Sequence, residues 1–404
     1  MNLSAFRPLA ALAGLAMFAL AACQGDFANR AEAPIPARTV ALMAQKGVAP
    51  ESPTLIRAYK KESELEIWKM RPDGTYVHLK TFPMCRWSGQ LGPKIREGDR
   101  QAPEGFYSIT PAQMNPNSAY YLSFNVGYPN ALDRALGHSG GSIMVHGACS
   151  SAGCFSMTDQ QIAEIYAIAR TSFSGGQRSI QMQSYPFRMT AENLAKHRLD
   201  PNMPFWKQLK DGNDHFEVSL KEPRVAFCGR RYVFNAAPAD NRAMTADTAC
   251  PPLKTDPETA RAVAEKADND ARKVAELARE GVRPVRVVYQ DGSQHPSFAS
   301  QVADVSRPET IVPPTEIAMD DKAARIGDKA AAGGLTKVPV VTPEAARAVA
   351  DRRAAEAPDP VAQALAPDTR RDMSAIAEDV GPTGSIRKPA KGSAKPGTGS
   401  GKTH

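Results

Sequence analysis

Hydrophobic and polar residues alternate along much of the region between residues 54 and 190, which is typical of β-strands with one buried face. Two such runs, 65–70 and 76–82, flank the turn-forming sequence Pro72-Asp73-Gly74 and predict a β-hairpin. Four further runs predict strands at residues 105–110, 120–126, 142–145 and 180–185. We therefore expect a fold that is mainly β with some α.

Helical spacing interrupts this pattern after Thr158 and Asp159, which are both good N-cap residues. The apolar stripe that follows predicts one face of a core helix. Two shorter helices are predicted at 191–197 and 204–209, as elaborations around the β core. The stripe consists of Ile162, Ile165, Tyr166 and Ala169.

The composition changes beyond Pro251. Every Trp and nearly every Tyr and Phe lies before residue 240, so the main core is expected to end near there. Asp256 then caps an Ala-rich helical pattern that runs to Glu280, and residues 285–289 predict a short strand. Pro, Ala and Gly dominate the rest, which predicts disorder. Because they offer little apolar surface, residues after about 254 are predicted to be dispensable for chemistry.

The beginning of the chain is typical of an export signal, with Arg7 ahead of an apolar run at 9–20. That run is shorter than the roughly 20 apolar residues of a membrane-spanning helix. It leads into Leu20-Ala21-Ala22-Cys23, which resembles the lipobox of bacterial lipoproteins. The resemblance implies cleavage before Cys23 and acylation of that cysteine, and Gln24 resembles the residue found in lipoproteins sorted to the outer membrane. An ordinary signal peptide ending in Ala-x-Ala is the alternative.

The formal net charge of +7 arises largely in a basic tail, because residues 385–404 carry lysines and an arginine but no acidic residue. No nucleic-acid-binding motif accompanies it, so no nucleic-acid partner is predicted. A solvated tail and attraction to an anionic envelope polymer both remain open.

Five cysteines remain if Cys23 is lipidated, in a compartment where disulfides persist. Two bridges would leave one free thiol. Cys228 with Cys250, which are close in sequence, and Cys85 with Cys149 are the candidate pairs, and the sequence alone does not fix the pairing.

Residues 140–157 combine an apolar strand that ends in a histidine with a tight loop that carries a cysteine. A free thiol is mostly protonated at neutral pH and needs a nearby base, for which His146 is the candidate beside Cys154. The carbonyl of Gly147 is a candidate to orient the imidazole. The N–H groups of Ala152, Gly153 and Cys154 are candidate donors to an oxyanion.

Other assignments of these residues are open. Cys149 is a second candidate nucleophile or a partner for Cys154, and His138 is a rival base. Ser151 lacks the Gly-x-Ser-x-Gly context of a serine nucleophile. A zinc site of His146, Cys149 and Cys154 would lack a second ligand cluster, so neither a metal nor another cofactor is predicted.

The order His146-Gly147 followed by Ser151-Ala152-Gly153-Cys154 resembles the signature of the YkuD-type L,D-transpeptidases. The resemblance covers residues 54–235. It implies a β-sandwich-like core, with Cys154 as nucleophile, His146 as proton donor and acceptor, Gly147 as the orienting backbone group and the loop before Cys154 as oxyanion hole. Ala152 departs from the many relatives that carry His there. Four further segments resemble the YafK-like subgroup: 92–94, 97–99, 103–107 and 154–159.

The reaction implied by this resemblance is attack on the L,D peptide bond of a peptidoglycan stem peptide, giving a thioester acyl-enzyme. An amine acceptor would make the enzyme a cross-linking transpeptidase, and water would make it a hydrolase, including one that releases an envelope lipoprotein from peptidoglycan. A non-catalytic peptidoglycan tether is the alternative from another class. The expected location is the periplasmic face of the outer membrane, through the lipid on Cys23.

These expectations divide the chain into six parts. They are a signal peptide (1–22), a linker (23–53), the catalytic domain (54–190), its C-terminal elaboration (191–253), an Ala-rich helix with a short strand (254–290) and a low-complexity, largely disordered basic tail (291–404).

Overall fold

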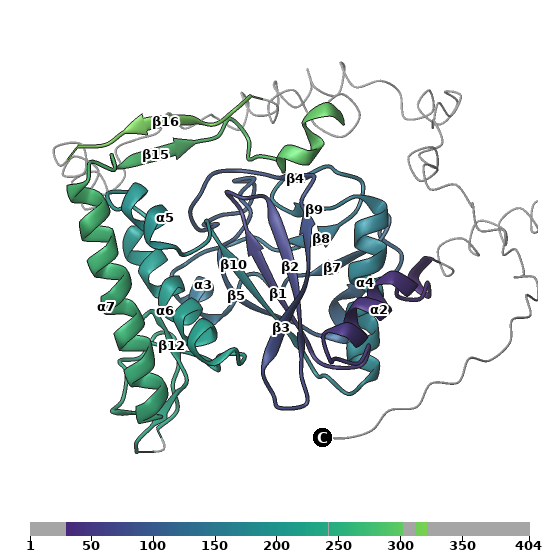
Figure 1. Cartoon of the computed structure of the whole chain (residues 1–404), viewed down its shortest axis with the longest axis horizontal. Helices are drawn as coiled ribbons and strands as arrows, with labels where there is room; N and C mark the ends of the chain where they lie inside the picture. Colours follow the sequence, from purple (N-terminus) through teal and green to yellow (C-terminus); the bar gives the residue numbers. More distant parts are fainter. Residues whose placement is uncertain (1–29, 241, 302–311, 321–404) are drawn as a thin grey trace, which may run out of the picture. The chain divides into compact units, whose positions relative to one another are not determined.

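The computed structural model describes residues 30–240, 242–301 and 312–320 (Figure 1). One five-stranded sheet has the order β3-β2-β1-β10-β5, in which β1 and β10 are parallel and the other neighbours antiparallel. Its strands are β1 (Thr54–Tyr59), β2 (Glu64–Met70), β3 (Tyr76–Pro83), β5 (Gly105–Ile109) and β10 (Ile180–Tyr185).

A second five-stranded sheet has the order β4-β9-β8-β7-β6, with β8 and β9 parallel. Buried side chains of both sheets, such as Ile56 and Val145, belong to one hydrophobic core. The mixed, mainly β fold with a β-sandwich-like core is thus confirmed. The strands are β4 (Arg86–Trp87), β6 (Met114–Asn115), β7 (Ser123–Asn125), β8 (Met144–His146) and β9 (Phe155–Ser156).

Helix α4 (Asp159–Ser174) begins where the sequence predicts, because the Thr158 hydroxyl accepts a hydrogen bond from the Gln161 N–H at 3.2 Å. Its apolar stripe is buried and it packs against β1, β7 and β8. Along the chain, the 3₁₀ helix η1 (Pro111–Gln113) directly precedes β6, and helix α3 (Ala131–Ala135) lies between β7 and β8.

The predicted linker (23–53) is wrong for residues 30–53, which are part of the folded domain. Helix α2 (Ala37–Gln45) buries Met43 completely. The Thr39 hydroxyl donates to Glu164 at 2.6 Å, and Arg170 donates to the Ala33 carbonyl at 2.9 Å. The Ala- and Pro-rich composition gave no sign of this docking, because the hydrogen bonds to α4 join residues 125 and 137 positions apart in the sequence.

Helices α5 (Ala191–Lys196) and α6 (Met203–Ser219) follow β10. Helix α6 extends well past the predicted 204–209, because Trp206, Leu209 and Phe216 lie on one buried face. Two hairpins come next, β11 (Val225–Cys228) with β12 (Arg231–Phe234), and β13 (Ala236–Pro238) with β14 (Leu253–Thr255).

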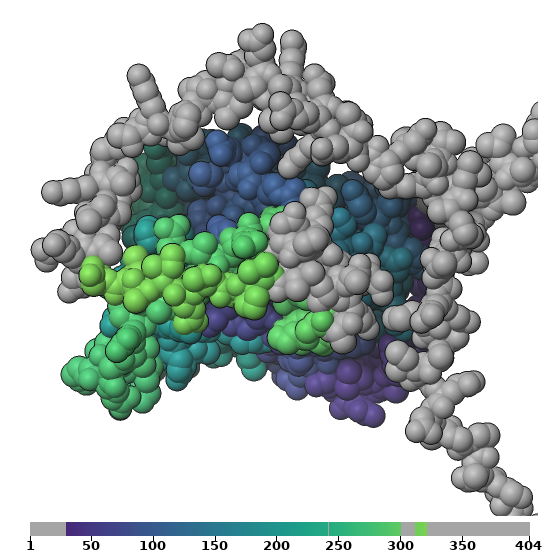
Figure 2. Space-filling view, turned by 90° about the horizontal axis from the view of Figure 1, so that it is seen from above, coloured from purple at the N-terminus to yellow at the C-terminus, as the bar shows by residue number. Residues whose placement is uncertain are grey.

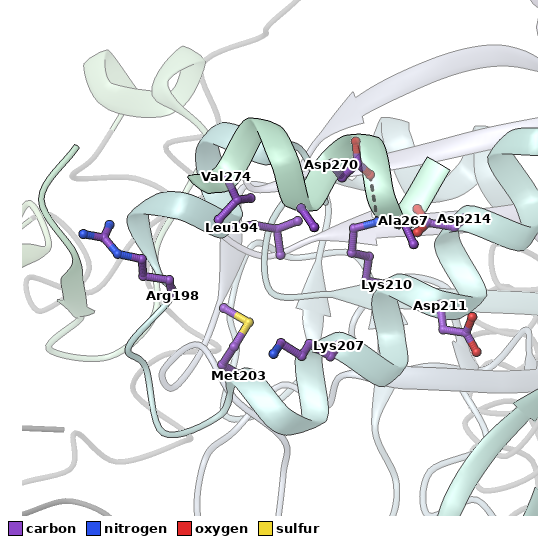
Figure 3. A pocket seen from close by; sticks show the side chains of 11 residues that line it. Leu194, Arg198, Met203, Lys207, Lys210, Asp211, Asp214, Ala267, Asp270 and Val274 are labelled. Carbon is purple, nitrogen blue, oxygen red and sulfur yellow. Dashed lines mark hydrogen bonds and ion pairs between the residues drawn. The ribbon is translucent and has the colours of Figure 1, made fainter. Parts of the chain in front are cut away.

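The Ala-rich helix is confirmed as α7 (Pro257–Arg279), which packs against α5 and α6 (Figure 1). Between the three helices lies a pocket of about 420 Å³. Figure 3 shows Met203 and Lys207 of α6 on one side of it, with Leu194 of α5 and Val274 of α7 opposite. An ion pair of 2.8 Å between Lys210 and Asp270 bridges α6 and α7 at one end.

The predicted disordered tail begins too early at residue 291. Strand β15 (Val285–Val288) pairs with β16 (Thr315–Ala318), and the 3₁₀ helix η2 (Pro296–Gln301) follows a segment that packs on the core. A small number of buried apolar side chains hold this segment on the core, among them Val287, Tyr289 and Phe298. The signal peptide, Cys23 and the rest of the tail lie outside the described residues.

Both expected disulfides are confirmed. Cys85 is bonded to Cys149 and Cys228 to Cys250, which leaves Cys154 as the free cysteine of the described residues. Within the same described part of the chain, no helix is both long and apolar enough to cross a membrane.

His197 should make the fold sensitive to acid. Its ring is fully buried and stacks on Phe187 at 4.7 Å, and burial, with the nearby Lys61 ammonium, lowers the pKa of His197 from 6.5 to about 4. The neutral ring therefore contributes stability that is complete above pH 6.5 and is lost as the pH falls toward 4. Replacing it with a neutral ring, in His197→Phe, should remove up to about 3 kcal/mol of the acid-induced loss in the free energy of unfolding.

The measurement is urea unfolding of both proteins between neutral pH and pH 4. Parallel losses of stability in the two proteins would contradict this role of His197.

Candidate active site

His146 lies at the end of β8, where its backbone is held between β7 and β9. Its Nδ1 lies 2.6 Å from the Gly147 carbonyl oxygen, so the ring nitrogen donates there and Nε2 carries the lone pair in the neutral form. A side chain on Gly147 would meet the Asp159 carboxylate at 2.5 Å and the Tyr120 carbonyl at 3.0 Å. Glycine is thus required where the orienting carbonyl stands.

The remaining faces of the imidazole contact Tyr120 and Ser156. The Tyr120 ring lies 4.7 Å away at an angle of 35° and is half exposed. Ser156 Oγ lies 3.4 Å from His146 Nε2 and donates its own proton to the Ser150 carbonyl at 2.6 Å. Because that proton is already used, Ser156 can only accept from Nε2, and it does so once the ring is protonated.

Cys154 directly precedes β9, on the strand next to the one that carries His146. Its Sγ accepts a hydrogen bond from the Met144 N–H at 3.4 Å and lies 4.0 Å from the Ser142 carbonyl oxygen. The thiol therefore rests against the same strand, β8, that ends in the imidazole. Because β8 and β9 are parallel, with Val145 opposite Phe155, Cys154 lies beside the start of β8 and His146 lies two positions further along, at its end.

Burial keeps both groups neutral in the resting site. It lowers the pKa of His146, against the opposing effect of the Gly147 hydrogen bond. It raises the pKa of the Cys154 thiol, which the Met144 N–H and the Lys94 ammonium oppose. A neutral thiol beside a neutral imidazole, rather than an ion pair, is the resting state at neutral pH.

The loop before Cys154 differs from the sequence-based expectation. Ser151 Oγ accepts from the N–H groups of Gly153 at 3.3 Å and Cys154 at 3.0 Å, and donates to the Cys154 carbonyl at 2.8 Å. Two of the three expected oxyanion donors are therefore engaged by a buried hydroxyl. Only the Ala152 N–H has no partner among the described residues.

Several contacts of the site were not predicted from the sequence. Met144 donates through its backbone, and no residue type signals that role. Ser156 lies within the motif around Cys154 but faces His146 only because β8 and β9 are in parallel register, with His146 opposite Ser156. Tyr120 reaches the imidazole from the segment leading into β7.

The rival assignments are also decided by geometry. Cys149 is bonded to Cys85, so it is neither a nucleophile nor a zinc ligand. His138 Nδ1 lies 3.4 Å from the Asp133 carboxylate, just beyond the end of α3. No cluster of three or more potential metal-ligating side chains occurs within the described part of the chain.

Comparison with known proteins gives the family. Residues 66–175 match the model of the YkuD L,D-transpeptidase catalytic domain. Over 182 residues the chain is 43% identical to the putative L,D-transpeptidase YafK of Escherichia coli K12, covering 45% of this chain and 74% of that protein. The chain belongs to the YkuD L,D-transpeptidase family.

Solved structures show weaker likeness to this YkuD-family chain. The cell shape determining protein Pgp2 of Campylobacter jejuni is 15% identical, with a TM-score of 0.28 over 62% of this chain and 80% of that one. Bd1075 of Bdellovibrio bacteriovorus is 12% identical, with a TM-score of 0.25 over 43% of this chain and 76% of that one. Both TM-scores are too low to support an argument about this chain.

The match to the YkuD domain includes His146, Cys154 and the Cys85–Cys149 bridge. Strands β1 and β10, which form the centre of the first sheet, fall outside the matched residues, as does everything after residue 175.

The neutral resting site predicts a steep pH dependence of thiol reactivity. Alkylation of Cys154 by iodoacetamide should rise roughly tenfold per pH unit from about pH 6.5 to 8.5, because only the thiolate reacts and the pKa of this thiol is raised. Peptide mapping by mass spectrometry assigns the label to Cys154. A rate that is flat across this range would mean a preformed thiolate–imidazolium pair and would contradict the neutral state.

Proposed function

We propose that this chain is a cysteine-dependent enzyme of the L,D-transpeptidase family that cleaves L,D peptide bonds of peptidoglycan stem peptides through a thioester on Cys154. The observation that carries the proposal is a free thiol and an imidazole on adjacent parallel strands, with the imidazole oriented by the Gly147 carbonyl at 2.6 Å. A thiol, a base and a group that orients the base are a common arrangement for nucleophilic catalysis by cysteine.

In the acylation step His146 Nε2 removes the thiol proton as Cys154 Sγ bonds to the carbonyl carbon of the stem peptide. The imidazolium keeps its Nδ1 hydrogen bond to Gly147, and its new Nε2 proton can be donated to Ser156 Oγ, 3.4 Å away. His146 then gives this proton to the departing amine as the C–N bond breaks. The products are a thioester on Cys154 and the released amine.

The oxyanion formed in this step needs donors that are already in place. Ala152 supplies the first, because its N–H has no other partner among the described residues. The Gly153 N–H would join only by giving up Ser151 Oγ. The Met144 N–H, directed at Cys154 Sγ, stabilises the thiolate before attack.

The fate of the thioester decides between two activities. An amine of another stem peptide or of an envelope lipoprotein would give cross-linking, and water would give hydrolysis, including release of such a lipoprotein. In both cases neutral His146 takes the proton of the acceptor and returns it to the Cys154 sulfur. Tyr120, half exposed over the imidazole, lies where the acceptor would approach.

We further propose that the enzyme is exported and held at the periplasmic face of the outer membrane by acyl chains on Cys23. The support is the sequence Leu20-Ala21-Ala22-Cys23-Gln24 and the presence of two disulfides, which persist in oxidising compartments. A purely tethering role would need neither a free thiol nor an oriented base.

Loss of Cys154 or His146 should separate an enzyme from a tether. Cys154→Ala should form no covalent adduct with a carbapenem or with muropeptides, and His146→Ala should slow adduct formation by roughly 10²–10⁴-fold because the general base is missing. His138→Ala, which removes a histidine paired with Asp133, is the matched control and should keep the wild-type rate.

Intact-protein mass spectrometry follows the adduct, and analysis of the released muropeptides distinguishes amine from water as acceptor. A Cys154→Ala protein that still acquires the adduct would sink the assignment.

A further inference from the structure

Residues 289–293, here called the clamp, lie against the strand next to the nucleophile although they are far from it in sequence. Trp87 and Ser293 exchange two backbone hydrogen bonds of 3.0 and 3.2 Å, and the Gly292 N–H donates to the Gly89 carbonyl at 2.8 Å. The clamp thus extends the second sheet beyond β4. Figure 2 shows β15, β16 and η2, in green, on one face of the molecule over the purple and blue part of the chain.

The close approach of the clamp requires glycine at position 292. Its backbone has a φ of +70°, and a Cβ there would overlap the Trp87 carbonyl oxygen and come within 2.6 Å of the Ser88 Cα. The contact therefore leaves no room for a side chain. A side chain at position 292 would displace residues 87–88.

Side chains fasten the clamp on both sides of Gly292. The Asp291 carboxylate forms an ion pair of 2.8 Å with Arg86, which is buried, and a second ion pair with Arg100. The Tyr289 ring packs edge-on against Trp87 at 5.0 Å, and its backbone N–H donates to the Gln90 side chain at 2.9 Å.

Arg100 also connects the clamp to the loop of the nucleophile. Its backbone lies 3.6 Å from the position that a Cβ on Gly153 would occupy, and its own φ is +55°, which is rare for a residue with a side chain. Such backbone strain persists only where surrounding contacts hold it.

A chain of hydroxyl contacts runs from the clamped strand to Cys154. Ser88 is fully buried, and its Oγ lies 2.8 Å from Ser151 Oγ. Because the Ser151 hydroxyl donates its single proton to the Cys154 carbonyl, the Ser88 hydroxyl must be the donor in this pair. Ser151 Oγ in turn accepts from the Cys154 N–H at 3.0 Å.

We propose that the clamp is a positioning element of the active site, which fixes the Cys154 loop through Ser88 and Ser151. This rests on the proposed function, and it assigns a role in the reaction to residues outside the matched YkuD domain. The clamp holds Trp87 and Ser88, Ser88 holds the Ser151 hydroxyl, and Ser151 holds both backbone groups of Cys154. Removing a link lets Cys154 Sγ move from the Met144 N–H and the imidazole. The proposed role of the clamp contradicts the prediction from the sequence that residues after about 254 are dispensable for chemistry.

The first test removes the hydroxyl that links the clamped strand to the loop. Ser88→Ala in the full chain should lower kcat for carbapenem acylation roughly 10- to 100-fold with KM changed less than about threefold, because a displacement near 1 Å of a reacting group costs rates of this order. Ser293→Ala is the matched control, since among the described residues the Ser293 hydroxyl contacts only the Gln294 carbonyl, at 3.5 Å, and its backbone bonds persist. It should stay within about twofold of wild type.

The second test asks whether the clamp acts through Ser88. Gly292→Ala should reproduce the kcat defect, and the Ser88→Ala/Gly292→Ala double variant should be little worse than either single one, since both break the same chain of contacts. Asp291→Asn keeps the glycine contact and an amide oxygen that can still accept from Arg86, and it should give a smaller defect of the same kind. Multiplying defects in the double variant, or wild-type kcat in Ser88→Ala, would overturn the proposal.

A third measurement is independent of any peptidoglycan substrate. Alkylation of Cys154 by iodoacetamide at about pH 8 should slow several-fold in Ser88→Ala but not in Ser293→Ala, because Cys154 Sγ is then no longer held against the Met144 N–H that stabilises the thiolate. Equal alkylation and acylation rates in Ser88→Ala and wild type, with Cys154→Ala inactive, would refute the clamp and leave the proposed function intact. A wild-type protein without acylation would refute the proposed function, while the alkylation rates would still test the clamp.

Discussion

The parallel pairing of β8 with β9 is the constraint on which the site depends. Parallel neighbours usually need a crossover of about a dozen residues or more, yet only the loop 147–154 joins these two strands. The connection is possible because both strands are very short and the loop turns back through left-handed backbone at Ala148, Cys149 and Gly153. Because the strands are so short, only two positions along the parallel pair separate His146, at the end of β8, from Cys154, just before β9.

Such a loop is costly, since residues with side chains rarely adopt positive φ. Among the contacts that hold it are the Cys85–Cys149 disulfide, the hydrogen bond of 2.8 Å from the Ala148 N–H to Asp159, and the hydrogen bonds of the Ser151 hydroxyl. Asp159 serves two elements, because it is also the first residue of α4. The segment between His146 and Cys154 is therefore held by a disulfide and by side-chain hydrogen bonds.

Burial sets the chemical character of the pair that results. The imidazole is almost fully enclosed, and burial shifts the pKa of His146 down and that of the Cys154 thiol up, so both favour their neutral forms. Catalysis must then move a proton from sulfur to nitrogen as the substrate binds, and the groups that favour the charged forms are already present. Gly147 and Ser156 accept from the imidazolium, and Met144 donates to the thiolate.

The sequence by itself determined the local parts: most strands from alternation, α4 from its cap and stripe, and the candidate roles of Cys154, His146 and Gly147 from a short motif. The number and spacing of the cysteines also offered Cys228–Cys250 and Cys85–Cys149 as candidate pairs, but only the structure fixed the pairing. Tertiary structure alone decided the docking of α2, the contact of Ser156 with His146 and the seating of residues 289–293 on β4. These contacts join residues far apart in the chain through backbone groups or single buried side chains, which leave no periodic pattern in a sequence. The free thiol of Cys154 was thus predictable from the number of cysteines and the motif. The contacts that hold it, from Met144 and Ser151, depend on the register of strands that pair only in the folded protein.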